Sequence, residues 1–331
     1  MVDNWILDVT AWIHIPFKLF AIYVVAKHTS PQFRHYSYFI LNSMFWSFLC
    51  NLAFTFAHLT PMFPAVCFRL DGLLSYFVDS ERFGHAMYIL AVFLITECSL
   101  ALLFSFPHRY IVFVYPKVAA RMRPVRVAVL CAGMHVFIAL IYFPAVIAWT
   151  VSYDEYPNKA ELPAKPFVFC FHPSGPRKTA IAVVYLMGAT TGIIFGFACA
   201  IMFLLKFKRM GTQIIHGDTL ALQKKVFTTL LMLSAVALFF CIPAVIFVCI
   251  ALFPHTPYAR EVSLVCMMFL TNHGSISAVA YLLFFKDNRV AVKRMLSNGI
   301  ARLTGRNSKV HSLFVKSSPV VVSQNDNTTG V

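Results

Sequence analysis

Residues 84–106 read GHAMYILAVFLITECSLALLFSF, and Glu97 is the only Asp, Glu, Lys or Arg among them. An α-helix needs about 20 mostly apolar residues to cross the hydrocarbon core of a bilayer. This run meets that length, and it is too long for the ~10-residue strands of a membrane β-barrel. The stretch therefore predicts a transmembrane helix.

Six further runs of similar length and composition lie on either side of this one. They are Trp5–Ala26, Tyr38–Leu59, Val125–Val151, Thr179–Leu205, Val226–Leu252 and Val262–Phe285. The sequence thus predicts an all-α membrane protein, a bundle of seven transmembrane helices within residues 1–296. The polar residues 297–331 predict a disordered cytosolic tail.

The composition agrees with this class. Hydrophobic residues make up 59% of the chain and charged residues 12%, whereas a soluble domain averages about 45–50% and 25%. No basic segment precedes the first apolar run, so we expect that run to remain in the mature protein as a helix and not to be removed as a signal peptide. The net charge of +15 must then lie between the apolar runs.

The basic residues are distributed unevenly between the loops. Four connecting segments (27–37, 107–124, 206–225 and 286–331) hold 19 Lys and Arg, and the alternate four (1–4, 60–83, 152–178 and 253–261) hold 7. Cytoplasmic loops of membrane proteins carry the excess of Lys and Arg. The sequence therefore predicts an external N-terminus and a cytosolic C-terminus, with the bilayer as partner and no nucleic acid.

Charged residues inside the apolar runs are the first candidates for function, because burying a charge in lipid costs about 2.5–3.5 kcal/mol. Glu97 lies 13 residues after Gly84, at a depth of about 20 Å. We predict that it forms the floor of a ligand pocket or an activation relay, hydrogen-bonded to Asn272 or His273. The structural alternative is a protonated carboxyl that satisfies a neighbouring helix. Lys18 is expected to extend its long side chain to the cytosolic interface.

We expect a small, largely apolar ligand among the outer halves of the helices, where Phe and Tyr are frequent. His85 and Tyr185, in the dipeptide Val184-Tyr185, complete the candidate pocket with Glu97, Asn272 and His273.

Several short motifs are distributed along nearly the whole chain, each at one place. They are Thr29-Ser30-Pro31, Leu41-Asn42-Ser43-Met44-Phe45-Trp46-Ser47, Phe63-Pro64-Ala65, Gly72-Leu73-Leu74, Pro107-His108-Arg109-Tyr110, Ile242-Pro243 and Asn272-His273-Gly274-Ser275. Together they resemble the serpentine chemoreceptors of nematodes, most closely serpentine receptor class H, a group of rhodopsin-like seven-transmembrane G-protein-coupled receptors.

The resemblance implies a chemosensory receptor in the plasma membrane of sensory neurons or their cilia. Its partners would be a small-molecule ligand and a heterotrimeric G protein. By resemblance, Arg109 and Tyr110 form a switch at the end of the third helix, and Pro243 marks the bend of the sixth. Basic residues at both ends of the last cytosolic loop add a G-protein face, which overlaps with attraction to anionic lipid: Lys206, Arg209 and Lys225.

Two other functions stay open. A ligand-gated channel or transporter would favour inverted repeats or polar residues along a pore, and the sequence shows neither. A receptor-like partner that does not signal is the second alternative, because Pro107 and His108 leave Arg109 without an adjacent carboxylate. The seventh run has no lysine, so we expect no retinal and no other cofactor. No nucleophile–base pair or metal-ligand spacing indicates an enzyme or a metal site.

Three further patterns carry structural predictions. Cys67 and Cys170 lie outside the apolar runs in an oxidising compartment, which favours a disulfide over two free thiols. Gly188, Gly192 and Gly196 have Gly-x-x-x-Gly spacing, which favours close packing within the bundle, with a receptor dimer as the alternative. Basic and apolar residues after the seventh run predict a short amphipathic helix on the inner leaflet.

Overall fold

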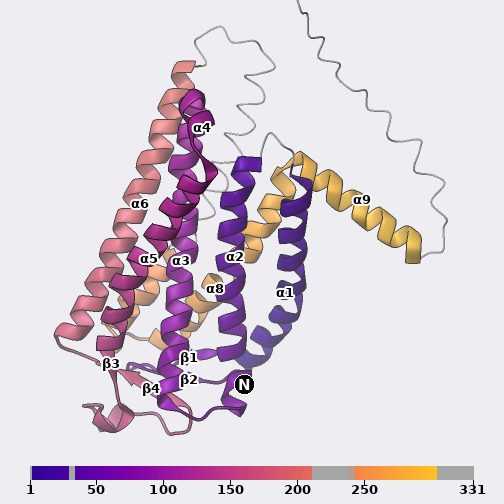
Figure 1. Cartoon of the computed structure of the whole chain (residues 1–331). Helices are drawn as coiled ribbons and strands as arrows, with labels where there is room; N and C mark the ends of the chain where they lie inside the picture. Colours follow the sequence, from indigo (N-terminus) through magenta and orange to yellow (C-terminus); the bar gives the residue numbers. More distant parts are fainter. Residues whose placement is uncertain (1, 30–33, 211–238, 240–241, 304–331) are drawn as a thin grey trace, which may run out of the picture. The chain divides into compact units, whose positions relative to one another are not determined.

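The computed structural model describes residues 2–29, 34–210, 239 and 242–303. The chain forms two compact units, Met1–Arg289 and Val290–Val331, which are described separately. Among its described residues, the first unit holds six helices long and apolar enough to cross a membrane (Figure 1). They are α1 (Val2–His28), α2 (Arg34–Ala57), α3 (Glu81–Val114), α5 (Pro124–Trp149), α6 (Pro176–Met210) and α8 (Ala259–Phe284). The prediction of a helical membrane protein is confirmed.

The sixth predicted run is described only in part. Residues Ile242–Leu252 form a shorter apolar helix, and 226–238 and 240–241 lie outside the described residues. A short helix, α4 (Pro116–Arg121), follows α3.

Several helices are longer than their apolar runs. The third run was predicted to end at Phe106, but α3 passes through Pro107 and continues to Val114. A proline removes one backbone hydrogen bond from a helix without ending it where the following residues can continue the ladder. Here Tyr115 N still donates to Ile111 O, 2.8 Å away. At the start of α6, Pro176 occupies the first helical position, where its fixed φ and missing N–H cost nothing.

A small antiparallel sheet covers one end of the bundle, and nothing in the sequence indicated it. Its strands run in the order β1-β2-β4-β3 (Figure 1). They are β1 (Leu59–Pro61), β2 (Cys67–Leu70), β3 (Thr150–Val151) and β4 (Val168–Phe171). Leu59 and Val151, expected at the ends of helices, are strand residues. Strands of two to four residues are too short to show a period in the sequence.

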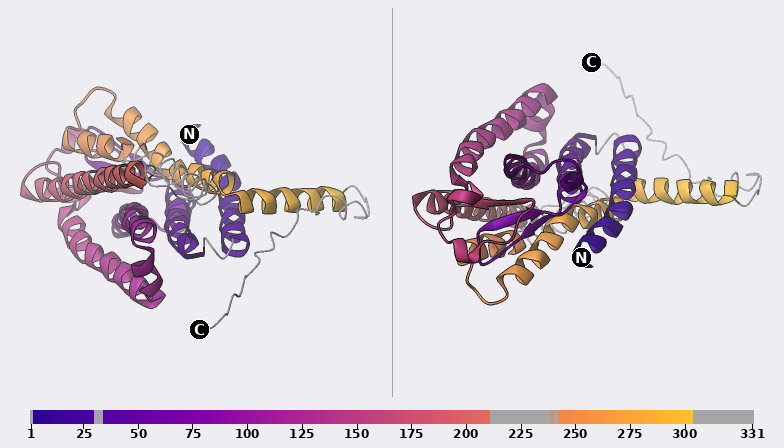
Figure 2. Two further views of the ribbon diagram at one scale, coloured as in Figure 1. Left: turned by 90° about the horizontal axis from the view of Figure 1, so that it is seen from above. Right: turned by 90° about the horizontal axis from the view of Figure 1, so that it is seen from below.

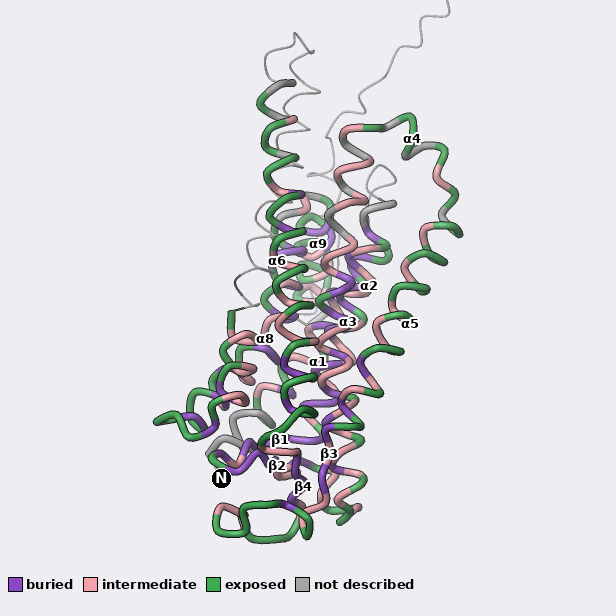
Figure 3. Tube along the Cα trace, turned by 90° about the vertical axis from the view of Figure 1, so that its left-hand side faces the viewer, coloured by how far each residue is buried: buried purple, intermediate pink, exposed green. Residues whose placement is uncertain are grey.

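Helix α3 lies at the centre of the first unit, in contact with α2, α5 and α6, while α8 contacts α1 and α2 (Figure 2). The outer surfaces of α5 and α6 are largely exposed and apolar, as a surface that faces lipid requires (Figure 3). Every backbone polar group inside a membrane must be paired, and helices achieve this within one segment.

The Gly-x-x-x-Gly stripe of α6 runs from the exposed Gly188 through the half-buried Gly192 to the buried Gly196. A Cβ atom added at Gly188, Gly192 or Gly196 would meet no other atom within 4 Å. The close approach of a neighbouring helix that this spacing favours is therefore not seen among the described residues.

Helix α9 (Lys286–Leu303) extends the predicted amphipathic segment. It includes residues 297–303, which the sequence assigned to the tail, because the apolar and basic pattern continues through Ile300, Arg302 and Leu303. The rest of the predicted tail lies outside the described residues.

Candidate functional site

The sheet is held together by a covalent bond between its two middle strands. Cys67 of β2 faces Cys170 of β4, and their Sγ atoms form a disulfide. The buried Tyr156 adds a second connection, because its hydroxyl accepts a hydrogen bond from Val66 N at 3.0 Å. Burial raises the pKa of this hydroxyl. The sheet is thus fixed over the end of the bundle.

The face of the sheet that meets the helices is aromatic. The ring of Phe171 stacks on Trp149 with centroids 4.4 Å apart and packs on Tyr88 at 4.6 Å. Trp149 Nε1 donates to His172 O at 2.9 Å. Close approach of α3 to β4 requires a glycine, since a Cβ at Gly84 would lie 2.3 Å from the ring of Phe169. These contacts close the bundle at this end.

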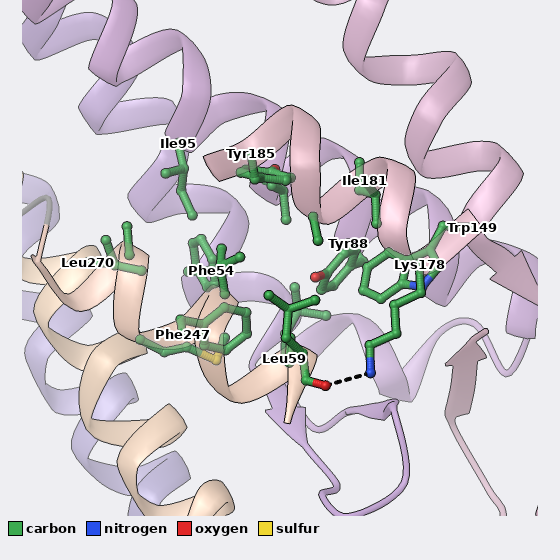
Figure 4. Close-up of a pocket in the computed structure, with 17 residues that line it drawn as sticks. Phe54, Leu59, Tyr88, Ile95, Trp149, Lys178, Ile181, Tyr185, Phe247 and Leu270 are labelled. Carbon is green, nitrogen blue, oxygen red and sulfur yellow. Dashed lines mark hydrogen bonds between the residues drawn. The ribbon is translucent and has the colours of Figure 1, made fainter. Parts of the chain in front are cut away.

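Beneath the aromatic contacts lies a pocket; the space not filled by protein atoms there is about 830 Å³, which includes space open to solvent. Side chains from α2, α3, α6, the helix Ile242–Leu252 and α8 converge on it, together with Leu59 and Trp149 (Figure 4). The lining is almost entirely apolar. It includes Phe54, Leu59, Tyr88, Val92, Ile95, Trp149, Lys178, Ile181, Ala182, Tyr185, Ala244, Phe247, Val248, Ala251, Leu252, Met267 and Leu270.

One face of α6 supplies two of the polar side chains of this pocket, those of Lys178 and Tyr185. Lys178, Ile181, Ala182 and Tyr185 line it, and their spacing of three, four and seven residues places them on one side of a helix. Lys178 Nζ donates to Pro173 O at 2.9 Å. It also donates to Leu252 O at 2.9 Å (Figure 4). The Lys178 side chain is only 9% exposed.

Of the five residues predicted for the pocket, Tyr185 lines it and the other four do not. His85 lies beside the sheet, where its Nε2 is 2.7 Å from Cys170 O. Asn272 and His273 follow the lining residue Leu270 on α8, and both bond to their own helix: Asn272 Nδ2 donates to Met268 O and His273 Nδ1 to Leu270 O.

Glu97 has a different partner from the two expected. Its fully buried carboxylate pairs with Nδ1 of His135 on α5, and not with Asn272 or His273. The ring of Trp46 packs on His135, with centroids 5.3 Å apart. No sequence pattern indicated this pair, because its members lie 38 residues apart on different helices and no local spacing connects them.

Lys18 does not reach the interface, and the prediction that it does so is wrong. Its side chain is 2% exposed, and Nζ donates to Ser47 O at 3.2 Å and to Ser47 Oγ at 3.0 Å. The close contact of α1 with α2 and α8 encloses the side chain before it can extend outward.

The residues predicted for a G-protein face lie away from the sheet. Arg109 and Tyr110 belong to the last two turns of α3, and Lys206 and Arg209 to the last turns of α6. Both helices end at the opposite end of the unit from the sheet (Figure 1). Pro243 lies in the helix Ile242–Leu252, and Lys225 lies outside the described residues.

The residues that sequence reasoning missed are Lys178, Tyr88 and Trp149. Lys178 follows Pro176 and Arg177, so it looked like an ordinary loop cation. Aromatic residues are so frequent in all seven runs that none of them stood out. Within the described ranges, no group of three or more His, Cys, Asp or Glu side chains has an arrangement that could hold a metal ion.

Comparison with known proteins identifies the family. No curated protein sequence matches the chain. Among solved structures, that of squid rhodopsin superposes with a TM-score of 0.63 at 13% identity, covering 91% of this chain and 86% of the rhodopsin. This likeness shows a rhodopsin-like fold. The sequence profile of the serpentine type 7TM GPCR chemoreceptor Srh matches residues 4–298. The chain therefore belongs to the Srh family of serpentine seven-transmembrane G-protein-coupled chemoreceptors.

Proposed function

We propose that this receptor detects a small, largely apolar ligand in the pocket beneath the sheet and transmits the signal to a heterotrimeric G protein at the opposite end. The observation that carries the proposal is the pocket itself. Small-molecule sites are concave and lined mainly by apolar and aromatic side chains, with a few polar groups among them. The pocket beneath the sheet has such a lining, with Lys178 and Tyr185 among its apolar residues.

The sheet end would face outside, with the N-terminus, in the plasma membrane of a sensory neuron or its cilium. The disulfide between Cys67 and Cys170 supports this orientation, because such bonds persist in oxidising compartments. The excess of Lys and Arg in the four alternate segments supports a cytosolic position for the other end.

Helix α6 offers a direct connection between the two ends. Its 35 residues span about 50 Å, from Lys178 at the pocket to Lys206 and Arg209 in its last turns. A ligand that binds one of two bundle arrangements more tightly shifts the equilibrium toward it. Displacement of α6 or of the helix Ile242–Leu252 at the pocket would then alter the far end, where Arg109 and Tyr110 also lie.

The stripe of Gly188, Gly192 and Gly196 leaves a receptor dimer as a further proposal. Small residues let helix backbones approach closely in lipid. Gly188 is exposed, and over the described residues a Cβ added at any of the three glycines would meet nothing within 4 Å outside its own stretch of helix.

The test is a screen of small odorants on cells that express the chain, with calcium or cAMP as the readout. Once an agonist is found, Ala182→Trp should abolish the response, because Ala182 lines the pocket and is 7% exposed. Ala180→Trp is the matched control: it adds the same side chain two residues earlier, at an exposed position of the same helix. Equal responses from the two variants would contradict the assignment of the pocket.

The route of the signal needs its own measurement. We expect Arg109→Ala to reduce G-protein activation while ligand binding to the purified receptor is retained. Unchanged signalling would make Arg109 a simple interfacial anchor. A ligand-evoked current that persists when G proteins are blocked would favour a channel.

A further inference from the structure

Lys178 is an unusual residue to find in an apolar pocket. Among the described residues, no carboxylate lies within 4.0 Å of its ammonium, since the ion pairs of this part of the chain involve other side chains. It is nine-tenths buried and is the only Lys, Arg, Asp or Glu among the residues that line the pocket. A buried charge is costly unless it is paired.

Its position on the helix adds to the cost. Lys178 is the third residue of α6, and the first turn of a helix carries the positive end of the helix dipole. A cation there is disfavoured and an anion is favoured. Arg177, the residue before it, brings a second positive charge to the same turn. A positive charge in an apolar pocket at the positive end of a helix departs from ordinary sequence preferences, and such departures gather at functional sites.

We propose that the pocket takes a monocarboxylate with an extended apolar chain or ring, whose carboxylate pairs with Lys178. This inference rests on the proposed function and adds the chemical class of the ligand. An ammonium has three N–H donors. Pro173 O and Leu252 O use two of them, which leaves one for a ligand oxygen.

The same face of α6 indicates how the rest of the ligand would lie. Tyr185 is seven residues after Lys178, about 10 Å along the helix axis, and Ile181 and Ala182 lie between them on the pocket wall. The Tyr185 hydroxyl is buried, and its ring packs edge-on against Tyr142 with centroids 5.8 Å apart. The apolar body of the ligand would extend from Lys178 along this wall toward Tyr185.

The two carbonyl bonds of Lys178 suggest a purely structural role as the competing explanation, because a lysine that bonds the last carbonyls of a neighbouring helix stabilises its end. The two roles differ in one measurable respect. A structural lysine does not distinguish an acid from its ester, whereas a lysine that pairs with the ligand does.

The experiment measures direct binding of octanoate, methyl octanoate and 1-octanol to the full chain in nanodiscs. We expect wild type to bind octanoate about tenfold to a hundredfold more tightly than the ester, as a charge-assisted hydrogen bond allows. In Lys178→Met this preference should disappear while binding of the ester is retained, which also shows that the variant is folded. Arg177→Gln, which removes a charge at the exposed neighbouring position, should keep the preference.

The outcomes separate this inference from the proposed function. If methyl octanoate or 1-octanol binds and signals while octanoate does not, the carboxylate assignment is overturned and the apolar pocket stands. If wild type binds acid and ester equally, Lys178 is structural and the inference is again overturned. If none of the three binds, octanoate recognition is overturned, and a silent screen of neutral odorants would then count against the pocket as well. The acid–ester comparison in wild type needs no variant to fold.

Discussion

Lys18 of α1 and Ser47 of α2 form a buried hydrogen-bonded contact within the bundle, with Nζ 3.0 Å from Oγ. Gly274 of α8 makes room for it: a Cβ atom at this position would lie 1.5 Å from Ser47 Oγ and 2.6 Å from Lys18 Nζ. Three helices that are distant in the sequence therefore meet at one point. The glycine of the Asn272-His273-Gly274-Ser275 motif has a steric role that the motif by itself did not reveal.

We predict that Gly274→Ala destabilises the receptor by about 1–3 kcal/mol, the usual cost of adding a methyl group to a packed interior. The melting temperature of the purified protein in detergent measures the effect. Gly192→Ala is the matched control, because an added Cβ there meets nothing within 4 Å. An equal melting temperature for Gly274→Ala and wild type would show that Lys18 and Ser47 move apart at no cost.

Glu97 and His135 should be energetically coupled. Removing one partner of a buried pair leaves the other unpaired, at a cost of about 3–5 kcal/mol. We therefore expect Glu97→Leu and His135→Leu each to lower stability substantially, and the double variant to lose less than the sum by at least about 1 kcal/mol.

The control for this cycle is a pair of the same residue types outside the bundle. His255 Nε2 lies 3.0 Å from Glu161 Oε1 with the histidine 70% exposed, and an exposed pair contributes about 0–1 kcal/mol. Additive effects at Glu97 and His135 would mean that the two side chains do not stabilise each other.

The disulfide closes a loop of 103 residues, so its loss should be costly. We expect Cys67→Ser, Cys170→Ser and the double variant to lose the same amount, about 2–5 kcal/mol, because any of them breaks the bridge. Thermal melting with peptide mass spectrometry under non-reducing conditions provides the measurement. Cys249→Ser, at an exposed free thiol, should leave stability unchanged. Detection of unlinked Cys67 in wild type would contradict this assignment.

Stability should fall in mild acid because of His58, which follows α2. Burial lowers the pKa of His58, against the opposing effects of Asp8 and Asp71. The unfolded chain therefore binds a proton at this position at a higher pH than the folded chain does. The contribution is fully present above the unfolded pKa of about 6.5 and is lost as the pH falls through it toward the folded value.

We expect wild type to melt at a lower temperature at pH 5.5 than at pH 7.5, and His58→Gln to show a smaller difference. His28→Gln, at an exposed histidine, should behave as wild type. If His58→Gln kept the full pH dependence, other groups would be responsible for it.

The length of an apolar run is a local property of the sequence, so the helices could be predicted from it. The family motifs are also short and local, so they could be recognised without the structure. Six of the seven predicted runs appear as helices long enough to cross a membrane, with ends shifted by a few residues. Of the five residues predicted for the pocket, only Tyr185 lines the pocket that the described residues form. The other four were chosen for their chemistry and their depth in the bundle. Neither property specifies the direction in which a side chain points.

The sequence by itself determined that this protein is a helical membrane protein, because the bilayer imposes a similar length and an apolar character on every span. The motifs along the chain determined the receptor family. Tertiary structure alone decided which polar residues meet. It paired Glu97 with His135, enclosed Lys18 beside Gly274, and brought Lys178 into an apolar pocket beneath the sheet. Such contacts join residues far apart in the chain, and they depend on how helices rotate and approach one another.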